Sequence, residues 1–440
     1  MEIARSPSAA GIILRLLLAR GTHQPTSPIV FDDSIVASEV SIISDDGAVV
    51  RLPSTMPGTR RRLADGAAAI VLSTALRVDV RGVTFEGGEA SHGVSAVVVE
   101  AGELTIENCT LRNISGARAA LRATGGTVSI SNCTFADKQG GAIEAASGSQ
   151  MTVVGSELVR NGASANRGGG IHVSGNATML TVGGTSFESN SAIDSGGGLY
   201  VAGGTVVLAN RTLLHGNDAP VRPTMDLAGG ETSYALPAPS GRWVNTAELD
   251  ETLGTLVSAL AQYGTHTQAD YPFGCPPGSY GTDDDIDTQV SSVCKGACPA
   301  GKICAGATSQ PQPCTEGAYC PMGSPGGTFC EPGTYGTLTN LTAQEECQDC
   351  PRGHYCQGGK YIPCPLNQYG PFTREFLPTA CQACPRFAIT AGTGTVSVDE
   401  CECDTGYFNT KLAAGEVQCD LCPVGSLCVD TGTNLSTSAS

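Results

Sequence analysis

The stretch GGGIHVSGNATMLTVGGTSFESNSAIDSGGGLYV, residues 168–201, contains two glycine triplets that begin 28 residues apart. Each triplet leads into an apolar strand pattern, IHV or LYV, and neither is followed by a lysine. A phosphate-binding loop would need GxxxxGK[ST], or GxGxxG between a strand and a helix. A calcium-binding GGxGxDxUx repeat is excluded because Val173 stands where the aspartate is required. We therefore interpret the triplets as corners of a repeated structure.

A regular period runs through the first half of the chain. Short apolar segments end on a large residue at spacings of 26, 24, 23, 29 and 26 residues, at Phe85, Leu111, Phe135, Leu158, Phe187 and Leu213. Each repeat has room for two or three short strands and for no helix. Parallel strands with such short connections must coil, with each rung pairing with the next about 4.8 Å away. The predicted fold class is mainly β, a right-handed parallel β-helix solenoid over residues 11–217.

Alternation along the strands assigns the two faces of the coil. The inward-facing positions are expected to be Leu121, Ile143, Ile171 and Leu199. The residues that follow them should form an outward-facing ladder, which we take as the candidate surface-binding site: Arg122, Glu144, His172 and Tyr200. At the corners, stacked amides of Asn161, Asn190 and Asn217 can satisfy backbone groups.

These repeats resemble those of polymorphic outer-membrane proteins, whose signatures are GGA(I/V/L) and FxxN. The matching residues are GGAI at 140–143 and FESN at 187–190, within a resemblance that covers roughly residues 65–220. Those proteins are surface adhesins, so the resemblance implies a β-helix that acts in adhesion.

The N-terminal stretch AAGIILRLLLARG has two interpretations. It is similar to a signal-peptide core, but Arg15 interrupts it and no clean small-x-small cleavage site follows. Alternatively, it resembles the strand and Gly-Thr corner that open many pectin-lyase-like folds, in which case the chain would begin inside a longer protein.

Composition argues against nucleic acid as a partner and indicates the compartment in which the chain folds. With 42 acidic and 25 basic residues the formal net charge is −17, which repels nucleic acid. Cys109 and Cys133 lie in the first half, whereas the other 18 of the 20 cysteines lie between Cys275 and Cys428. Such a density predicts a disulfide framework made in an oxidising compartment. Of seven N-x-S/T sequons, we retain Asn176 and Asn340 as glycosylation candidates.

The boundary between the two halves is expected at residues 218–274, interpreted as a linker. Within it, four leucines fall on one face of a helix over roughly 247–263, namely Leu249, Leu253, Leu256 and Leu260. This amphipathic helix is predicted to cap the open end of the coil, where unpaired strand edges would invite aggregation.

Residues 275–428 contain their own repeat, mostly Cys-x-x-Gly followed by an aromatic or aliphatic residue two positions later. The pattern resembles the cysteine-rich modules of ephrin-receptor-like and tumour-necrosis-factor-receptor-like ectodomains. Three CxxC pairs are compatible with zinc or redox sites, but one nearby histidine, His354, and the Gly/Pro-rich context favour disulfides. Four loops of 19, 17, 17 and 16 residues predict the pairs Cys275–Cys294, Cys330–Cys347, Cys364–Cys381 and Cys403–Cys419. Residues 429–440 are predicted to be a disordered tail.

Two function classes follow from these features. The favoured one is an extracellular or cell-surface binding or structural ectodomain, whose ligand is a protein or a glycan and whose membrane anchor, if any, lies outside the given sequence. No cofactor or metal is expected. The alternative is a secreted polysaccharide lyase or glycoside hydrolase. It is disfavoured because Glu86 and Glu188, at equivalent outward positions, are four rungs apart, about 19 Å.

Overall fold

A computed structural model describes residues 2–8, 11–25, 29–31, 37, 39–45, 47–52, 68–87, 95–116, 118–162, 166–244, 270–411, 415–424 and 428. These residues form strands and turns with four short 3₁₀ helices, and no α-helix occurs among them. The chain divides into two compact units, one of residues 1–275 and 281–294 and the other of 276–280 and 295–440. We call them the solenoid unit and the cysteine-rich unit.

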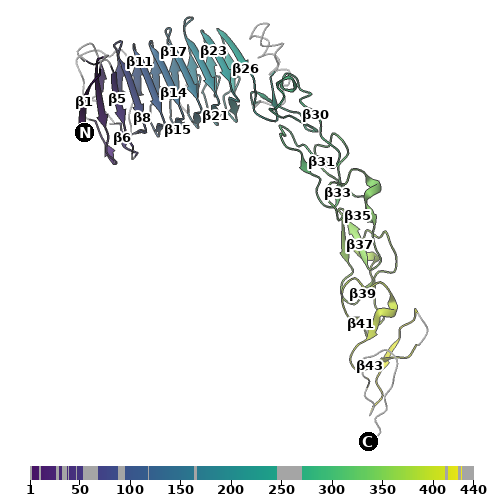
Figure 1. The fold of residues 1–440 in the computed structure, drawn as a ribbon. Coiled ribbons are helices and arrows are strands. Elements are labelled where there is room, and N and C mark those ends of the chain that lie inside the picture. The colour runs from purple at the N-terminus through teal and green to yellow at the C-terminus, as the bar shows by residue number, and fades with distance from the viewer. Residues whose placement is uncertain are drawn as a thin grey trace. The chain divides into compact units, whose positions relative to one another are not determined.

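The solenoid unit is built from three long sheets that the chain visits in turn (Figure 1). Sheet A contains β1 (Glu2–Ser8), β2 (Gly11–Leu17), β5 (Glu39–Ile43), β8 (Arg77–Arg81), β11 (Glu103–Glu107), β14 (Thr127–Ser131), β17 (Gln150–Val154), β20 (Met179–Gly183), β23 (Thr205–Ala209) and β26 (Glu231–Ala235). Sheet B contains β3 (Thr22–His23), β6 (Val49–Arg51), β9 (Thr84–Glu86), β12 (Thr110–Arg112), β15 (Thr134–Ala136), β18 (Glu157–Val159), β21 (Ser186–Glu188) and β24 (Leu213–His215). Sheet C contains β4 (Ile29–Phe31), β7 (Ala68–Leu72), β10 (Ser95–Val99), β13 (Leu121–Ala123), β16 (Ile143–Ala145), β19 (Ile171–Val173), β22 (Leu199–Val201) and β25 (Met225–Leu227).

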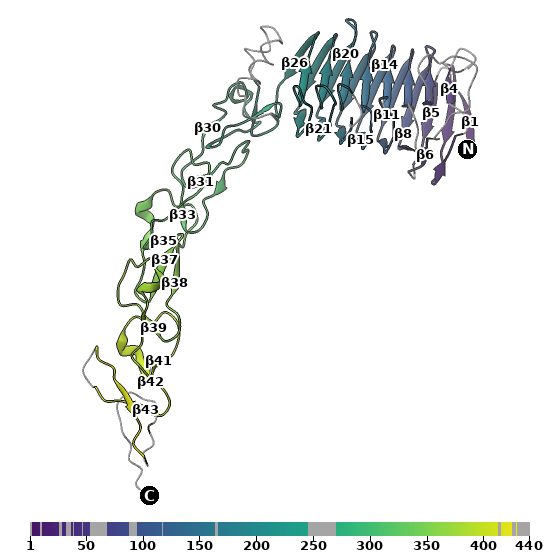
Figure 2. The same cartoon turned by 180° about the vertical axis from the view of Figure 1, so that it is seen from behind.

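From β2 to β26 every strand pairs in parallel with its counterpart in the next rung, which confirms the predicted parallel coil (Figure 2). The inward positions Leu121, Ile143, Ile171 and Leu199 are in register and fully buried. Because rungs are joined only by hydrogen-bonded neighbours, each apolar side chain packs on its equivalents above and below.

The periodic anchors also stack inside the coil. Phe135, Leu158 and Phe187 are consecutive partners on sheet B and are completely buried. One anchor was wrong by one residue: Leu214, not Leu213, pairs with Phe187 and is buried. The sequence has two adjacent leucines there, and only the strand register decides which one faces inward.

The glycine triplets are corners, as predicted. Gly168 has φ +65, and a Cβ on Gly169 would lie 2.1 Å from the carbonyl oxygen of Ser191 in the next rung. In the same connections, before the glycine triplets, asparagine amides satisfy backbone groups. The Nδ2 atom of Asn161 donates to the carbonyl of Phe135 at 2.9 Å and to Oδ1 of Asn190 at 2.9 Å. Asn190 repeats this arrangement with Asn217, so the asparagine ladder is confirmed.

The coil extends beyond the predicted boundary at residue 217. Strands β25 and β26 continue sheets C and A to Ala235, so this part of the expected linker is wrong. Pro-rich and Gly-rich turns obscured the period here, although Met225 and Leu227 occupy the inward positions. The helix expected over 247–263 and the tail expected over 429–440 lie outside the described residues.

A different set of residues closes the end of the coil. Tyr271 pairs with Leu214 on sheet B through two backbone hydrogen bonds of 2.9 and 3.0 Å. Beside them, β27 (Arg242–Trp243) pairs with β28 (Phe273–Gly274). The buried side chain of Gln289, in the 3₁₀ helix η1 (Ile286–Gln289), donates to and accepts from the backbone of Ala238 at 2.9 Å.

This arrangement assigns the first cysteine loop to the solenoid. The disulfide Cys275–Cys294 closes the loop that contains η1, and Asp283 in the same loop forms an ion pair of 2.6 Å with Arg211. Residues 281–294 therefore belong to the solenoid unit, although their cysteines follow the spacing of the second half.

The cysteine-rich unit is a succession of two-stranded hairpins. They are β29 (Ser279–Tyr280) with β30 (Gly296–Ala297), β31 (Lys302–Ile303) with β32 (Gln312–Pro313), β33 (Ala318–Tyr319) with β34 (Thr328–Phe329), β35 (Thr334–Tyr335) with β36 (Gln348–Asp349), β37 (His354–Gln357) with β38 (Lys360–Pro363), β39 (Gln368–Tyr369) with β40 (Gln382–Ala383), β41 (Ala388–Thr390) with β42 (Cys401–Cys403), and β43 (Tyr407–Asn409) with β44 (Cys419–Leu421). Three 3₁₀ helices lie between strands: η2 (Gln344–Glu346), η3 (Pro378–Ala380) and η4 (Val398–Glu400).

Nine disulfides occur in residues 275–428, and the four pairs expected from loop length are among them. The other five are Cys298–Cys304, Cys314–Cys320, Cys350–Cys356, Cys384–Cys401 and Cys422–Cys428. None of the three CxxC pairs is bonded internally, because each of their cysteines joins a different loop. The unit has too few apolar residues to form a stabilising core, and the disulfides stabilise it instead.

Substitution of Phe187 by Asp tests the packing of the coil. It would bury an unpaired carboxylate between two rungs, at a cost of several kcal/mol. Since rungs communicate only through neighbours, we expect hydrogen exchange to accelerate first in β18 and β24. Ser186→Asp, on the outward side of the same strand, is the control. Uniform protection across sheet B in the Phe187 variant would contradict the interpretation.

Replacing Cys275 and Cys294 by Ser tests the closing loop. Without this disulfide, which joins cysteines 19 residues apart, the free energy of local unfolding should fall by about 3 kcal/mol. The fluorescence of Trp243, the single tryptophan, should then change at lower denaturant, whereas exchange in β11–β17 stays unchanged. The matched control replaces Cys364 and Cys381, whose removal should leave Trp243 unaffected. Equal responses of the two double variants would disprove the assignment of this loop.

Candidate binding groove on sheet C

The predicted outward ladder exists in register on sheet C. Arg122 on β13, Glu144 on β16, His172 on β19 and Tyr200 on β22 are successive partners, and Asp226 on β25 continues the row. Parallel pairing without a register shift brings these residues together, although they are 22 to 28 residues apart in sequence.

A groove of about 550 Å³ lies over this ladder. Arg122, Glu144 and His172 contribute to its floor. The connections between sheets B and C provide its wall, with Arg118, Asn166, Arg167 and Asp194. Two glycines, Gly141 and Gly168, also line it, so that backbone is accessible there. A volume of this size suits a small ligand, such as one or two sugar units, rather than a folded domain.

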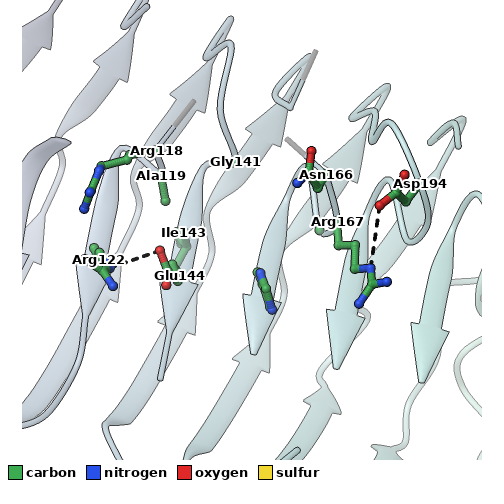
Figure 3. Close-up of a pocket in the computed structure, with 11 residues that line it drawn as sticks. Arg118, Ala119, Arg122, Gly141, Ile143, Glu144, Asn166, Arg167 and Asp194 are labelled. Carbon is green, nitrogen blue, oxygen red and sulfur yellow. Dashed lines mark ion pairs between the residues drawn. The ribbon is translucent and has the colours of Figure 1, made fainter. Parts of the chain in front are cut away.

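Ion pairs organise the polar groups of the groove (Figure 3). Nε of Arg122 lies 3.1 Å from a carboxylate oxygen of Glu144, in a half-buried pair. Nε of Arg167 lies 3.9 Å from a carboxylate oxygen of Asp194. The groove thus contains three guanidinium groups and two carboxylates, a surplus of positive charge in a chain whose net charge is −17.

Tyr200 supports the groove instead of lining it. Its side chain is buried, with 4% exposed. The guanidinium carbon of Arg167 lies 5.1 Å from the centre of the Tyr200 ring, and a nitrogen of Arg167 donates to its hydroxyl at 2.9 Å. His172 meets the same ring edge-on, with centroids 5.1 Å apart. The expectation that Tyr200 is exposed for binding is therefore wrong, because the loop carrying Arg167 covers it.

The protonation of His172 follows from its position. Partial burial lowers its pKa below the usual value, Glu144 acts in the opposite direction, and Arg167 lowers the pKa further. The imidazole is therefore neutral at pH 7, and can both donate and accept a hydrogen bond in the groove.

Lys138 is a buried residue beside the turn that precedes the groove residue Arg118. It occupies the rung before Asn161 in the asparagine ladder, where its backbone N–H donates to Oδ1 of Asn161 at 3.2 Å. Only 1% of the side chain is exposed, and Nζ donates to the carbonyl oxygens of Gly116 at 2.8 Å and Ser115 at 3.4 Å. These carbonyls precede Arg118, so the ammonium group helps to fix the turn that leads to this arginine. Burial lowers the pKa of Lys138 to about 8.

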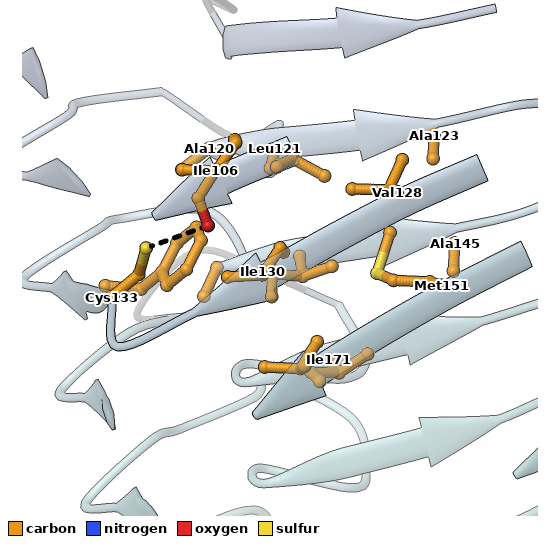
Figure 4. Close-up of a cluster of buried hydrophobic side chains, with 14 of the residues drawn as sticks. Ile106, Ala120, Leu121, Ala123, Val128, Ile130, Cys133, Ala145, Met151 and Ile171 are labelled. Carbon is orange, nitrogen blue, oxygen red and sulfur yellow. Dashed lines mark hydrogen bonds between the residues drawn. The ribbon is translucent and has the colours of Figure 1, made fainter. Parts of the chain in front are cut away.

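Cys109 and Cys133 are free, buried and adjacent on neighbouring rungs. Figure 4 shows Cys133 among the buried apolar side chains of the coil. The Sγ atom of Cys133 accepts the backbone N–H of Cys109 at 3.4 Å and donates to the carbonyl of Ser131 at 3.1 Å. In the next rungs, hydroxyls of Ser156 and Thr185 replace the sulfur. The two thiols do not form a bridge, and they belong to a polar ladder that satisfies the backbone groups of this corner.

The wall residues were not predicted from the sequence. Arg118, Asn166, Arg167 and Asp194 lie in connections whose lengths differ from rung to rung. One signal was present: Arg167 and Ser195 occupy the same position before the two glycine triplets, and they form a parallel bridge. Aligning the residues before the corners would therefore have placed Arg167 at this face.

The sequons depend on the corner geometry to different degrees. Asn108, Asn132 and Asn210 directly follow β11, β14 and β23 and have φ of 54, 51 and 49. Asparagine tolerates this left-handed conformation, so these sequons have a structural explanation. Asn176 and Asn340 are exposed, and their glycosylation stays a prediction.

Comparison with known proteins agrees with this architecture. Residues 65–219 match the family model described as a right handed beta helix region. The chain is also 34% identical over 89 residues to "Cysteine repeat modular protein A" from Toxoplasma gondii, an alignment that covers 19% of this chain. The same alignment spans only 2% of the length of that protein. The β-helix, the disulfides and the cysteine-repeat relative together indicate an extracellular or secreted surface protein.

Two further observations concern the described part of the chain alone. It contains no group of three or more His, Cys, Asp or Glu side chains arranged to hold a metal ion. It also contains no helix that is long and apolar enough to cross a membrane.

Replacing Lys138 by Asn tests the cost of the buried ammonium group. The folded chain loses this proton near pH 8 and the unfolded chain near 10.5, so stability should rise with pH between these values. Below pH 8 both states are protonated, and the buried ammonium group lowers the free energy of unfolding by its full amount, on the order of 3 kcal/mol.

Asparagine would instead continue the ladder. We expect the rungs around residue 138 in Lys138→Asn to unfold at higher denaturant at pH 7 and to show no increase in stability at alkaline pH, as measured by circular dichroism and by hydrogen exchange in β15 and β18. Lys360→Asn, which removes an exposed lysine, serves as the control. A less stable Lys138 variant, or one that keeps the alkaline rise, would contradict this account.

Proposed function

We propose that this extracellular surface protein is a recognition protein whose groove on sheet C binds a carboxylated or sulfated saccharide. The observation that carries the proposal is the set of three arginines around one groove on an otherwise acidic chain. A guanidinium group presents donors in a planar fork that fits the two oxygens of a carboxylate or sulfate. A ligand anion would compete with Glu144 and Asp194 for these donors, which are already oriented.

The geometry of the carboxylates favours binding over hydrolysis. Glu144 and Asp194 each lie beside an arginine. Asp194 precedes β22, two rungs beyond the strand of Glu144, so the two are separated by about 10 Å along the axis alone. The carboxyl pair of a glycoside hydrolase is generally closer, at about 5–9.5 Å. A polysaccharide-degrading enzyme stays the alternative.

Binding and turnover can be separated in one experiment. The full chain is applied to an array of carboxylated and sulfated oligosaccharides with their neutral parents, and each acidic member is also assayed for new reducing ends. We expect binding to an acidic member, no binding to its neutral parent and no new ends. Binding should fall roughly tenfold in Arg122→Gln, since a charge-assisted hydrogen bond is lost.

Arg77→Gln is the matched control, because Arg77 pairs with Glu103 across adjacent rungs of sheet A in the same way, outside the groove. Glu144→Gln should preserve or strengthen binding, since it removes the competing carboxylate. New reducing ends that disappear in Glu144→Gln would establish the enzyme instead. Equal losses in the Arg77 and Arg122 variants would refute the groove as the binding site.

A further inference from the structure

One turn of the cysteine-rich unit departs from all its equivalents. The fourth residue of each described repeat has a positive φ, between 66 and 91: Gly278, Gly301, Gly317, Gly333, Gly353, Asn367, Phe387 and Gly406. Glycine adopts this conformation without strain and asparagine tolerates it, whereas a bulky side chain is disfavoured. Phe387, at φ 66, is therefore held in a strained conformation that the neighbouring repeats avoid. Such strain is often found where a side chain has a function.

The ring of Phe387 is part of an exposed stack. It lies parallel to the ring of Tyr407, with centroids 4.3 Å apart and planes 9° apart. The guanidinium carbon of Arg386 lies 4.6 Å from its centre. Phe387 is nevertheless 41% exposed. Leu421, 71% exposed, is directly opposite Tyr407 in the antiparallel pair β43–β44, and opposite residues of such a pair share a face. We call these four residues the aromatic row.

The segment that carries the aromatic row is strongly acidic. Between residues 384 and 424, exposed carboxylates belong to Asp399, Glu400, Glu402, Asp404, Glu416 and Asp420. The only cations of this segment are Arg386 and Lys411, and Lys411 forms an ion pair of 2.8 Å with Glu416. Five carboxylates thus remain against one guanidinium group. A basic partner would be attracted to this surface, whereas a second copy of it would be repelled.

We propose that the aromatic row is a docking surface for a lysine- and arginine-rich segment of another protein. Phenylalanine, tyrosine and arginine in the centre supply the contacts that are typical of interface hot spots. The exposed carboxylates of the same segment attract and steer a positively charged chain. This site is separate from the groove on sheet C and does not rest on the function proposed for it.

The test uses the full chain, immobilised, and a displayed library of random dodecapeptides as the probe. We expect the selected peptides to be rich in lysine and arginine and to bind more weakly as salt is raised. Phe387→Gly, which restores the residue of the other repeats, should lower their affinity roughly tenfold without destabilising the unit. Phe329→Ala removes another exposed ring, 59% exposed on β34, and should have no effect.

Leu421→Ser provides an independent check, because it leaves the strained turn and the stack unchanged. Peptide mapping of the disulfides establishes that each variant has folded. The proposal is overturned if no peptide is enriched, if the enriched peptides are neutral or acidic, or if Phe387→Gly and Leu421→Ser bind them as the original chain does. Self-association of the chain that Phe387→Gly abolishes would assign the surface to a second copy and would also overturn it.

Discussion

The parallel, in-register pairing of each rung with the next is the constraint on which the solenoid depends. It places equivalent residues directly above one another, so every property of a position is repeated along the coil. Inside, this produces continuous columns such as Phe135, Leu158 and Phe187. It also means that a buried polar group can be satisfied only by its own equivalents or by nearby backbone. The asparagine ladder and the Cys/Ser/Thr ladder are two solutions to this requirement.

The corners between sheets A and B show how the same constraint shapes composition. The residue after each sheet A strand from β8 to β23 is left-handed, with φ between 49 and 68, at Gly82, Asn108, Asn132, Gly155, Gly184 and Asn210. Only glycine and asparagine occupy this position, which accounts for part of the high glycine content. A Cβ on Gly155 would lie 2.8 Å from Oδ1 of Asn132, so glycine in one rung also makes room for the amide of the rung before it. Corner residues therefore depend on their neighbours as much as core residues do.

Sequence reasoning succeeded where a feature repeats within the chain and failed where it does not. The period predicted the coil, the inward columns and the register of the outward ladder from Arg122 to Tyr200. It could not predict that Arg167 covers Tyr200, since the connection before β19 has no equivalent of the same length in the preceding rungs. The closing loop was missed for a related reason. Gln289 follows the cysteine pattern of the second half in sequence, yet its partner is the backbone of Ala238 in the coil, and neither residue belongs to a repeat.

Repeats also supply an internal reference against which exceptions can be judged. At the corner position of Asn161, Asn190 and Asn217, the chain has Lys138 in the preceding rung, a buried cation whose charged form is disfavoured by burial. At the turn position of Gly353 and Gly406, it has Phe387, a strained aromatic ring. Both exceptions cost stability, and in both cases the equivalent residue that avoids the cost is present elsewhere in the same chain. Lys138 holds the turn before the groove residue Arg118, and Phe387 presents a ring at an acidic surface. In a repetitive protein, stability favours uniform positions, so the positions that break the pattern at a cost are where binding functions are to be sought.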